Sequence, residues 1–270
     1  MIKEHFFLIF TLCFCVVGYA QKNEFGFFVG SSGYYGDVGY EKAEQVILHQ
    51  SPAIGFMYKR NTHDYLSIRT SIQAGKIKAS DEWAKNPNTI ARNLSFESAI
   101  LDLNLGFEFN FFKFSSRKRK TTYSPYLFAG ISGILFNPKV MGTQIELQPL
   151  GTEGQGTQLP NTGKKYSRIA LAIPFGFGYK MNVSEKWSLA FEWTWRSAQT
   201  DYLDDVSTVY IDPNLLSSEA AALSNRSEIE ITNGKSRGNT NNNDWYNFTG
   251  ITFSYKIRNK AHKCPKALLP

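Results

Sequence analysis

Hydrophobic and polar residues alternate without a break over residues 101–110, which read LDLNLGFEFN. Successive side chains of a β-strand point to opposite faces, so this pattern predicts a strand with one apolar and one polar face. A half-buried strand of a soluble protein can show the same alternation. Here the pattern recurs along the chain and predicts eight strands, over residues 24–34, 52–60, 65–78, 94–114, 123–136, 166–181, 187–200 and 245–257.

The connections between these strands alternate in length. Those over residues 35–51, 79–93, 137–165 and 201–244 are long, whereas those over residues 61–64, 115–122 and 182–186 are short. This parity is typical of outer-membrane barrels. We therefore expect an all-β fold, an antiparallel transmembrane β-barrel of about eight strands with long extracellular loops and short periplasmic turns. The mean hydropathy of −0.30 is compatible with this, because only every second residue of such a strand is apolar.

The N-terminus has the features of a secretory signal peptide. Lys3 precedes an apolar run over residues 6–17, and small residues at Gly18 and Ala20 predict cleavage after Ala20. A signal anchor is the alternative, but the run is shorter than the roughly 20 residues of a spanning helix. Neither Cys13 nor Cys15 has a lipoprotein context. We expect a signal peptide over 1–20, Sec export to a Gram-negative outer membrane, a barrel over 21–257 and a periplasmic tail over 258–270.

Local composition sets further expectations for strands and loops. Pro174 lacks a backbone donor, so it predicts a bulge or a strand end within residues 166–181. Small residues leave the inward and outward positions of 123–136 ambiguous. Residues 151–157 and 239–244 are rich in Gly, Asn and Thr and predict flexible surface segments. Residues 215–223 are compatible with a short helix.

The polar face of the predicted strands carries charged residues into the lumen. An eight-stranded barrel has an interior that side chains can just fill, which argues against a wide aqueous pore. Charges removed from water need partners, so we expect a structural network of paired charges. A narrow polar path or a ligand site is the alternative. The network residues are Arg69, Asp102, Glu108, Lys180, Glu192 and Arg196.

The sequence shows no catalytic or metal-binding constellation. After leader cleavage, the histidines are His49, His63 and His262, and none lies in mid-strand beside a serine. We therefore expect no enzymatic activity, no cofactor, no metal and no small-molecule substrate. The net charge is +7, but the basic residues are dispersed and no nucleic-acid motif accompanies them. The 15% aromatic content fits the aromatic girdles of a membrane barrel.

Two basic segments on the expected periplasmic side are candidate partner-binding sites. A turn contains Arg117, Lys118, Arg119 and Lys120, and the tail contains Lys263, Cys264 and Pro265. A solvated turn and a frayed terminus are the simpler interpretations. Docking to an acidic partner is the functional one. Cys264 would be the one cysteine left after cleavage, so it could pair only with another chain.

Four sequence motifs carry a resemblance to a known family. They are residues 33–37 (GYYGD), 51–58 (SPAIGFMY), 123–130 (YSPYLFAG) and the basic 263–265 tail, and the likeness covers essentially the whole mature chain. The chain resembles the PorG family, an outer-membrane barrel component of the type IX secretion and gliding machinery. The resemblance implies a non-enzymatic barrel that anchors or aligns the periplasmic ring of PorK and PorN. A small barrel of adhesin or resistance type, acting through its loops, and a narrow solute channel are the alternatives.

Overall fold

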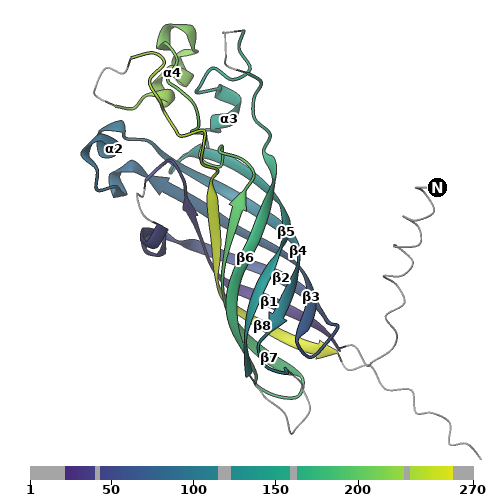
Figure 1. The fold of residues 1–270 in the computed structure, drawn as a ribbon. Helices are drawn as coiled ribbons and strands as arrows, with labels where there is room; N and C mark the ends of the chain where they lie inside the picture. Colours follow the sequence, from purple (N-terminus) through teal and green to yellow (C-terminus); the bar gives the residue numbers. More distant parts are fainter. Residues whose placement is uncertain (1–21, 40–42, 115–122, 159–162, 228–231, 258–270) are drawn as a thin grey trace, which may run out of the picture.

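Eight antiparallel strands close into a barrel in chain order, with β1 paired to β8 (Figure 1). The computed structural model describes residues 22–39, 43–114, 123–158, 163–227 and 232–257. The predicted leader and C-terminal tail lie outside the described residues. The predicted closed antiparallel barrel is confirmed. The strands are β1 (Lys22–Tyr35), β2 (Ser51–Asn61), β3 (Leu66–Ser80), β4 (Ser95–Asn110), β5 (Tyr123–Val140), β6 (Ile169–Asn182), β7 (Trp187–Ala198) and β8 (Trp245–Ile257).

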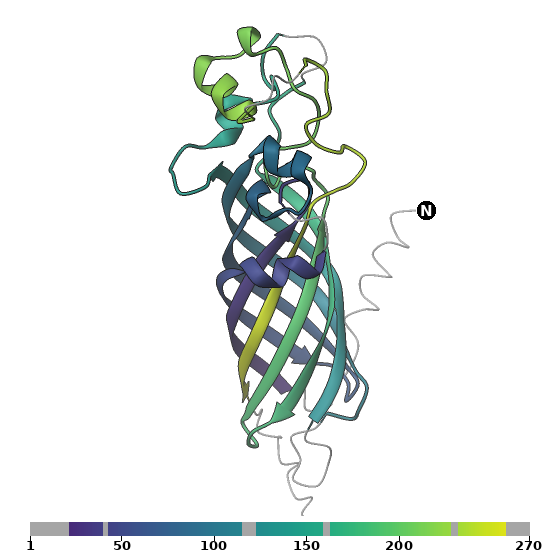
Figure 2. The ribbon, with the colours of Figure 1, turned by 90° about the vertical axis from the view of Figure 1, so that its left-hand side faces the viewer.

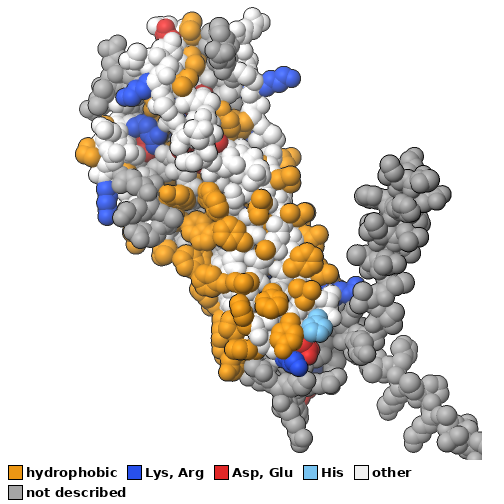
Figure 3. Space-filling model, viewed as in Figure 1, with side chains coloured by type: hydrophobic (Ala, Val, Ile, Leu, Met, Phe, Trp, Pro, Cys, Tyr) orange, Lys and Arg blue, Asp and Glu red, His pale blue; other side chains and the backbone are white. Residues whose placement is uncertain are grey.

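Residue alternation determines which side chains face out of the barrel. In β4 the odd-numbered apolar residues from Leu101 to Phe109 are exposed, and the even-numbered residues between them are buried. The same alternation in the other strands places hydrophobic side chains over the barrel wall (Figure 3). A wall of this kind is stable in lipid, because each strand satisfies its backbone hydrogen bonds through its neighbours. No described helix is long and apolar enough to cross a membrane.

The long connections all emerge at one end of the barrel, and the short turns lie at the other (Figures 1 and 2). We call these the long-loop end and the short-turn end. The described parts of the long connections fold into short helical segments. These are η1 (Ala43–His49), η2 (Asp81–Trp83), α2 (Pro87–Arg92), α3 (Leu147–Leu150), η3 (Pro213–Leu215) and α4 (Ser218–Ser224).

Several predicted boundaries were wrong. β4 ends at Asn110 instead of Phe114. The Phe111 amide still donates to Pro125 O at 3.1 Å in the same register, but Pro125 has no amide hydrogen with which to return the second bond of the pair. β5 continues to Val140, which pairs with Phe96 of β4. The helix expected over residues 215–223 is divided between η3 and α4.

Pro174 neither ends β6 nor creates a bulge. The pairs Ala129↔Phe175 and Ser132↔Ala172 keep one register on either side of it, and only the two intervening pairs of the β5–β6 ladder are missing. On its other side Pro174 pairs in register with Arg196 of β7. The missing proline donor therefore costs ladder contacts without shifting the strand.

The simple barrel pattern predicts a polar interior, but only part of the interior is polar. Its half nearest the long-loop end is a hydrophobic core that continues into the loops, where Leu147, Leu203 and Val206 pack against it. β5 contributes its even-numbered residues to the interior, which settles the ambiguous orientation of this strand. The inward apolar residues include Phe28, Tyr34, Ile77, Phe96, Ile100, Ile134, Phe136, Tyr246 and Phe248.

Candidate functional site

A cluster of charged side chains fills the lumen near the short-turn end. Glu108 of β4 lies at its centre, with Lys180 in direct contact, Lys59 Nζ at 3.4 Å and Arg69 Nη1 at 3.9 Å. Arg69 also donates to Glu192 Oε1 at 2.6 Å. All of these side chains are at least nine-tenths buried. The charges come from five different strands, so this cluster ties the walls of the barrel together.

A second polar cluster lies between the Glu108 cluster and the hydrophobic core. The fully buried Arg196 of β7 donates to Gln73 Oε1 at 2.6 Å and to Asp102 Oδ2 at 3.3 Å. The Tyr246 hydroxyl donates to the same Asp102 oxygen at 2.6 Å. Arg196 also lies over the Phe248 ring, with the guanidinium carbon 4.5 Å from the centroid. The lumen is thus crossed by two polar clusters and an apolar one.

The structure brings all six sequence-predicted lumen residues into these two clusters. Two further members, Glu24 of β1 and Lys59 of β2, were missed, although they form an ion pair with Glu24 Oε2 and Lys59 Nζ 3.2 Å apart. The sequence does indicate their position. Each is adjacent to an outward aromatic residue, Phe25 or Tyr58, so alternation points its own side chain into the lumen. The same alternation that assigned the lipid face would have found them.

The filled lumen predicts that the purified barrel does not conduct ions in a planar bilayer. A small cavity beside Arg69, Gln73 and Glu192 has room for only about one water molecule. We expect no stable single-channel steps. An Arg69→Ser variant, refolded in the same way, is the control: it removes a large side chain from the lumen and shows whether the assay detects a less densely filled interior. Regular steps from the unmodified protein would support the solute-channel alternative.

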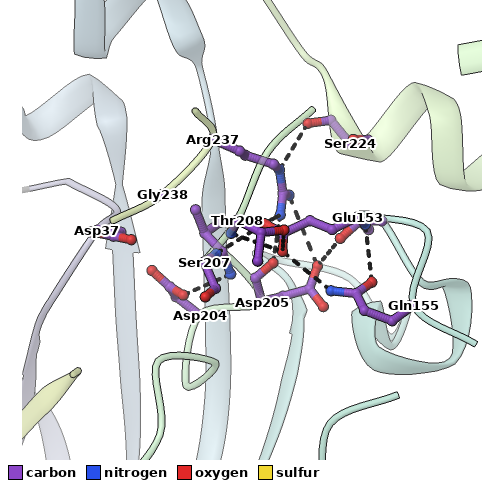
Figure 4. A network of polar contacts seen from close by, with 12 residues as sticks. Asp37, Glu153, Gln155, Asp204, Asp205, Ser207, Thr208, Ser224, Arg237 and Gly238 are labelled. Carbon is purple, nitrogen blue, oxygen red and sulfur yellow. Dashed lines mark hydrogen bonds and ion pairs between the residues drawn. The ribbon is translucent and has the colours of Figure 1, made fainter. Parts of the chain in front are cut away.

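At the long-loop end, Arg237 joins two of the long connections. Its guanidinium donates to Glu153 Oε1 at 3.0 Å and to the Asp205 carbonyl at 2.5 Å (Figure 4). Glu153 accepts in turn from the amides of Ser207 and Thr208, at 2.9 and 3.1 Å. We call this folded group of loops the cap.

Burial in the cap contradicts the prediction of a flexible surface segment for residues 151–155, whereas Gly156 and Thr157 are exposed. Thr152, Glu153 and Gln155 are almost completely buried. The glycines of this segment have positive φ angles at Gly151, Gly154 and Gly156, and such angles allow the tight turns that direct the polar side chains inward. The prediction for residues 239–244 was wrong at its last residue, Asp244, which is fully buried.

Arg92 of α2 attaches the other two long connections to the cap. Its guanidinium bonds both carboxylate oxygens of the buried Asp81, each at 2.8 Å. It also donates to the carbonyls of Asp37 and Arg237, at 2.6 and 2.9 Å. All four long connections are therefore joined, directly or through one residue, to Arg92 and Arg237.

Two buried carboxyl groups share one hydroxyl beneath the cap. The Tyr34 hydroxyl lies 2.5 Å from Asp204 Oδ2 and 2.9 Å from Asp244 Oδ1. One hydroxyl has a single proton to donate, so the second contact requires a proton on a carboxyl. Burial, with a contribution from neighbouring carboxylates, raises the pKa of both groups well above the usual range. Burial also raises the pKa of the nearby Asp201 to about 7.

These raised pKa values predict a cap that loosens as the pH rises. The folded cap holds protons that the same carboxyls in open loops release near pH 4, so their contribution to stability is complete below about pH 4. The contribution of Asp201 is lost as the pH rises through about 7, and those of Asp204 and Asp244 are lost as the pH rises through their own raised pKa values. We expect hydrogen exchange of residues 201–206, corrected for intrinsic rates, to accelerate between pH 5 and pH 8. An Asp244→Asn variant should have a shallower slope. An unchanged slope in Asp244→Asn and Asp201→Asn would contradict this origin.

The described histidines are not arranged for catalysis. His49 stacks on Trp83 with the ring centroids 4.0 Å apart, and His63 stacks near Tyr65 at 5.7 Å. Within the described ranges, no group of three or more His, Cys, Asp or Glu side chains is arranged to hold a metal ion. His262 and the proposed partner-binding residues, Arg117 to Lys120 and Lys263 to Pro265, lie outside the described residues.

Comparisons with known proteins find one family and a set of barrels. The family model described as "Domain of unknown function (DUF6089)" matches residues 3–266. A comparison with curated proteins finds no match. The attachment invasion locus protein Ail of Yersinia pestis, solved with the heparin analogue sucrose octasulfate, is 9% identical with a TM-score of 0.41, over 88% of this chain and 100% of that one. Neisserial surface protein A is 9% identical with a TM-score of 0.42, over 88% and 98%.

Proposed function

The chain belongs to the DUF6089 family, and we propose that it is a closed, non-enzymatic outer-membrane barrel that anchors a protein-export machine. The filled lumen carries this proposal. Glu108, Arg69 and Arg196 connect opposite walls through buried ion pairs, so the barrel is built as a rigid body and not as a conduit. A rigid membrane body with a closed interior suits an anchoring role.

The lipid-facing wall supports the outer-membrane location. Exposed aromatic and aliphatic side chains cover β1 to β8, and such a surface in water would be unusually apolar. Closed barrels of this type occupy outer membranes, with their short turns in the periplasm. By that rule, the long-loop cap faces the cell exterior.

The type IX secretion role rests on the resemblance to the PorG family. Both basic segments proposed to dock adjoin described residues at the short-turn end. Phe114 and Tyr123 flank the first segment, and Ile257 precedes the second. If that end faces the periplasm, the described residues that adjoin both segments face the side on which a periplasmic ring of the PorK and PorN type would lie.

Co-purification tests this docking role. We expect deletion of residues 258–270, or replacement of Arg117, Lys118, Arg119 and Lys120 by serine, to leave a folded barrel that recovers less of the ring proteins. A Cys264→Ser variant, compared on reducing and non-reducing gels, shows whether a covalent link contributes. A matched control replaces the exposed Lys186 in another short turn by serine. Unchanged recovery in both altered proteins would remove the docking proposal.

The cap favours one second candidate, a surface protein of adhesin or resistance type. Arg237 and Arg92 give the long connections a defined shape, which a recognition surface requires. The exposed Leu215 and Glu219 lie on η3 and α4 of the cap. Substituting both should impair a loop-dependent function and leave secretion unchanged.

A further inference from the structure

The lipid-facing surface of the barrel has a polar gap on β1 and β8. Outward positions are apolar from Phe25 to Val29 on β1 and from Ile257 to Ile251 on β8, and they are aromatic again at the paired Tyr35 and Trp245. Between these two rows the outward positions are small or polar, and they carry Ser31, Gly33, Asn247 and Thr249. Exposed to hydrocarbon, their polar groups would be costly.

The short helix η1 covers this gap from outside the barrel. It lies against the wall formed by β1 and β8 (Figure 2). Its Val46 is only 1% exposed and lies so close to Gly33 that a Cβ there would be 2.4 Å from Val46 Cγ1. Asn247, whose Oδ1 lies beside the same glycine, is fully buried. The Ser31 hydroxyl donates to the Gln50 side chain just after the helix.

The opposite side of η1 replaces the missing apolar surface. Ile47 is 60% exposed and Leu48 is 75% exposed. The flanking outward residues are also apolar: Pro52 of β2 pairs with Ser31, and Trp195 of β7 pairs with Asn247. Ile47 and Leu48 therefore continue a surface that is lipid-facing on both sides.

We propose that η1 is embedded in the membrane and that its exposed face contacts lipid. Ile47 and Leu48 enter the hydrocarbon of the leaflet nearest the long loops, and Val46 and Gln50 shield the polar gap behind them. Its position between two rows of lipid-facing residues favours lipid over a protein partner. The β1–β2 connection thus contacts the membrane itself. The proposal requires the membrane location but not a secretion role.

Photocrosslinking of the full chain in cells tests this proposal. A benzophenone amino acid replaces Leu48, Ile54 of the β2 lipid face, or Leu215 of η3. Leu215 is the matched control, because it is also a well-exposed leucine, at 54%, but lies in the cap. After irradiation, phospholipid and lipopolysaccharide adducts of the purified barrel are measured by mass spectrometry.

We expect adduct yields at position 48 to match those at position 54, and yields at position 215 to be about tenfold lower. Resistance to unfolding in detergent on gels confirms that each variant forms a barrel, and Ile47 provides a second position if Leu48 does not tolerate the change. A yield at both helix positions as low as that at position 215 would overturn the proposal. So would protein adducts in place of lipid adducts.

Discussion

Replacement of Glu108 by glutamine is expected to destabilise the barrel by about 3–5 kcal/mol, the cost of breaking a buried ion pair by removing one partner. Glutamine preserves the size of the side chain but removes its charge. Lys180, Lys59 and Arg69 then lose their shared counter-ion while their side chains remain almost completely buried. The measurement is urea unfolding of the barrel in lipid vesicles, followed by tryptophan fluorescence.

Glu97 provides the matched control on the same strand. It forms an ion pair with Lys76 at 3.2 Å, but the Lys76 side chain is 49% exposed. Solvent screening limits the contribution of such pairs to stability to about 0–1 kcal/mol, so Glu97→Gln should leave the free energy of unfolding nearly unchanged. Adding Lys180→Met to the Glu108→Gln variant should recover part of the loss, since it removes one unpaired cation. If Glu108→Gln were as stable as Glu97→Gln, the Glu108 cluster would not hold the barrel together.

Substitution of Arg237 by alanine is expected to open the cap and leave the barrel intact. Glu153 loses its cation while it remains buried, and the β5–β6 and β7–β8 connections lose their shared donor. A local loss of about 3 kcal/mol corresponds to roughly 100-fold faster hydrogen exchange in residues 151–157 and 203–208. Mass spectrometry of peptides from these segments and from β4 separates cap opening from barrel unfolding.

Arg168 is the control for Arg237, because it also pairs with a loop glutamate at the same end of the barrel. Its Nη1 lies 2.8 Å from Glu146 Oε2, but both side chains are more than one-third exposed. Arg168→Ala should therefore change exchange rates little. Equal protection in Arg237→Ala and the unmodified protein would mean that apolar packing of Leu203 and Val206, and not the ion pair, closes the cap.

The barrel wall could be predicted because strand alternation is a local property. The outward residues of β4 and the inward charges of β3, β4, β6 and β7 follow from period two alone. Inward Glu24 and Lys59 obey the same rule, so their place in the lumen was also predictable from the sequence. The apolar half of the lumen nearest the long-loop end did not follow. Ile77 and Phe136 belong to a core that includes loop residues such as Leu203, and alternation describes the strands alone.

The cap and η1 could not be predicted, because their contacts join residues far apart in a chain without periodicity. Arg237 and Glu153 are separated by 84 positions, and each lies in a segment whose composition is typical of open loops. Val46 is buried only because Gly33 leaves room for it on the barrel wall. Three-dimensional closure of the barrel creates both environments.

The charged interior also has a consequence for membrane insertion. A strand that pairs one residue out of register transfers all its inward side chains to the opposite face. For β3 and β4 that slip would expose Arg69 and Glu108 to hydrocarbon, whereas correct pairing lets Arg69 meet Glu192 of β7. The Glu108 cluster therefore favours the correct register of β3 and β4, because a one-residue slip would leave its charges facing lipid.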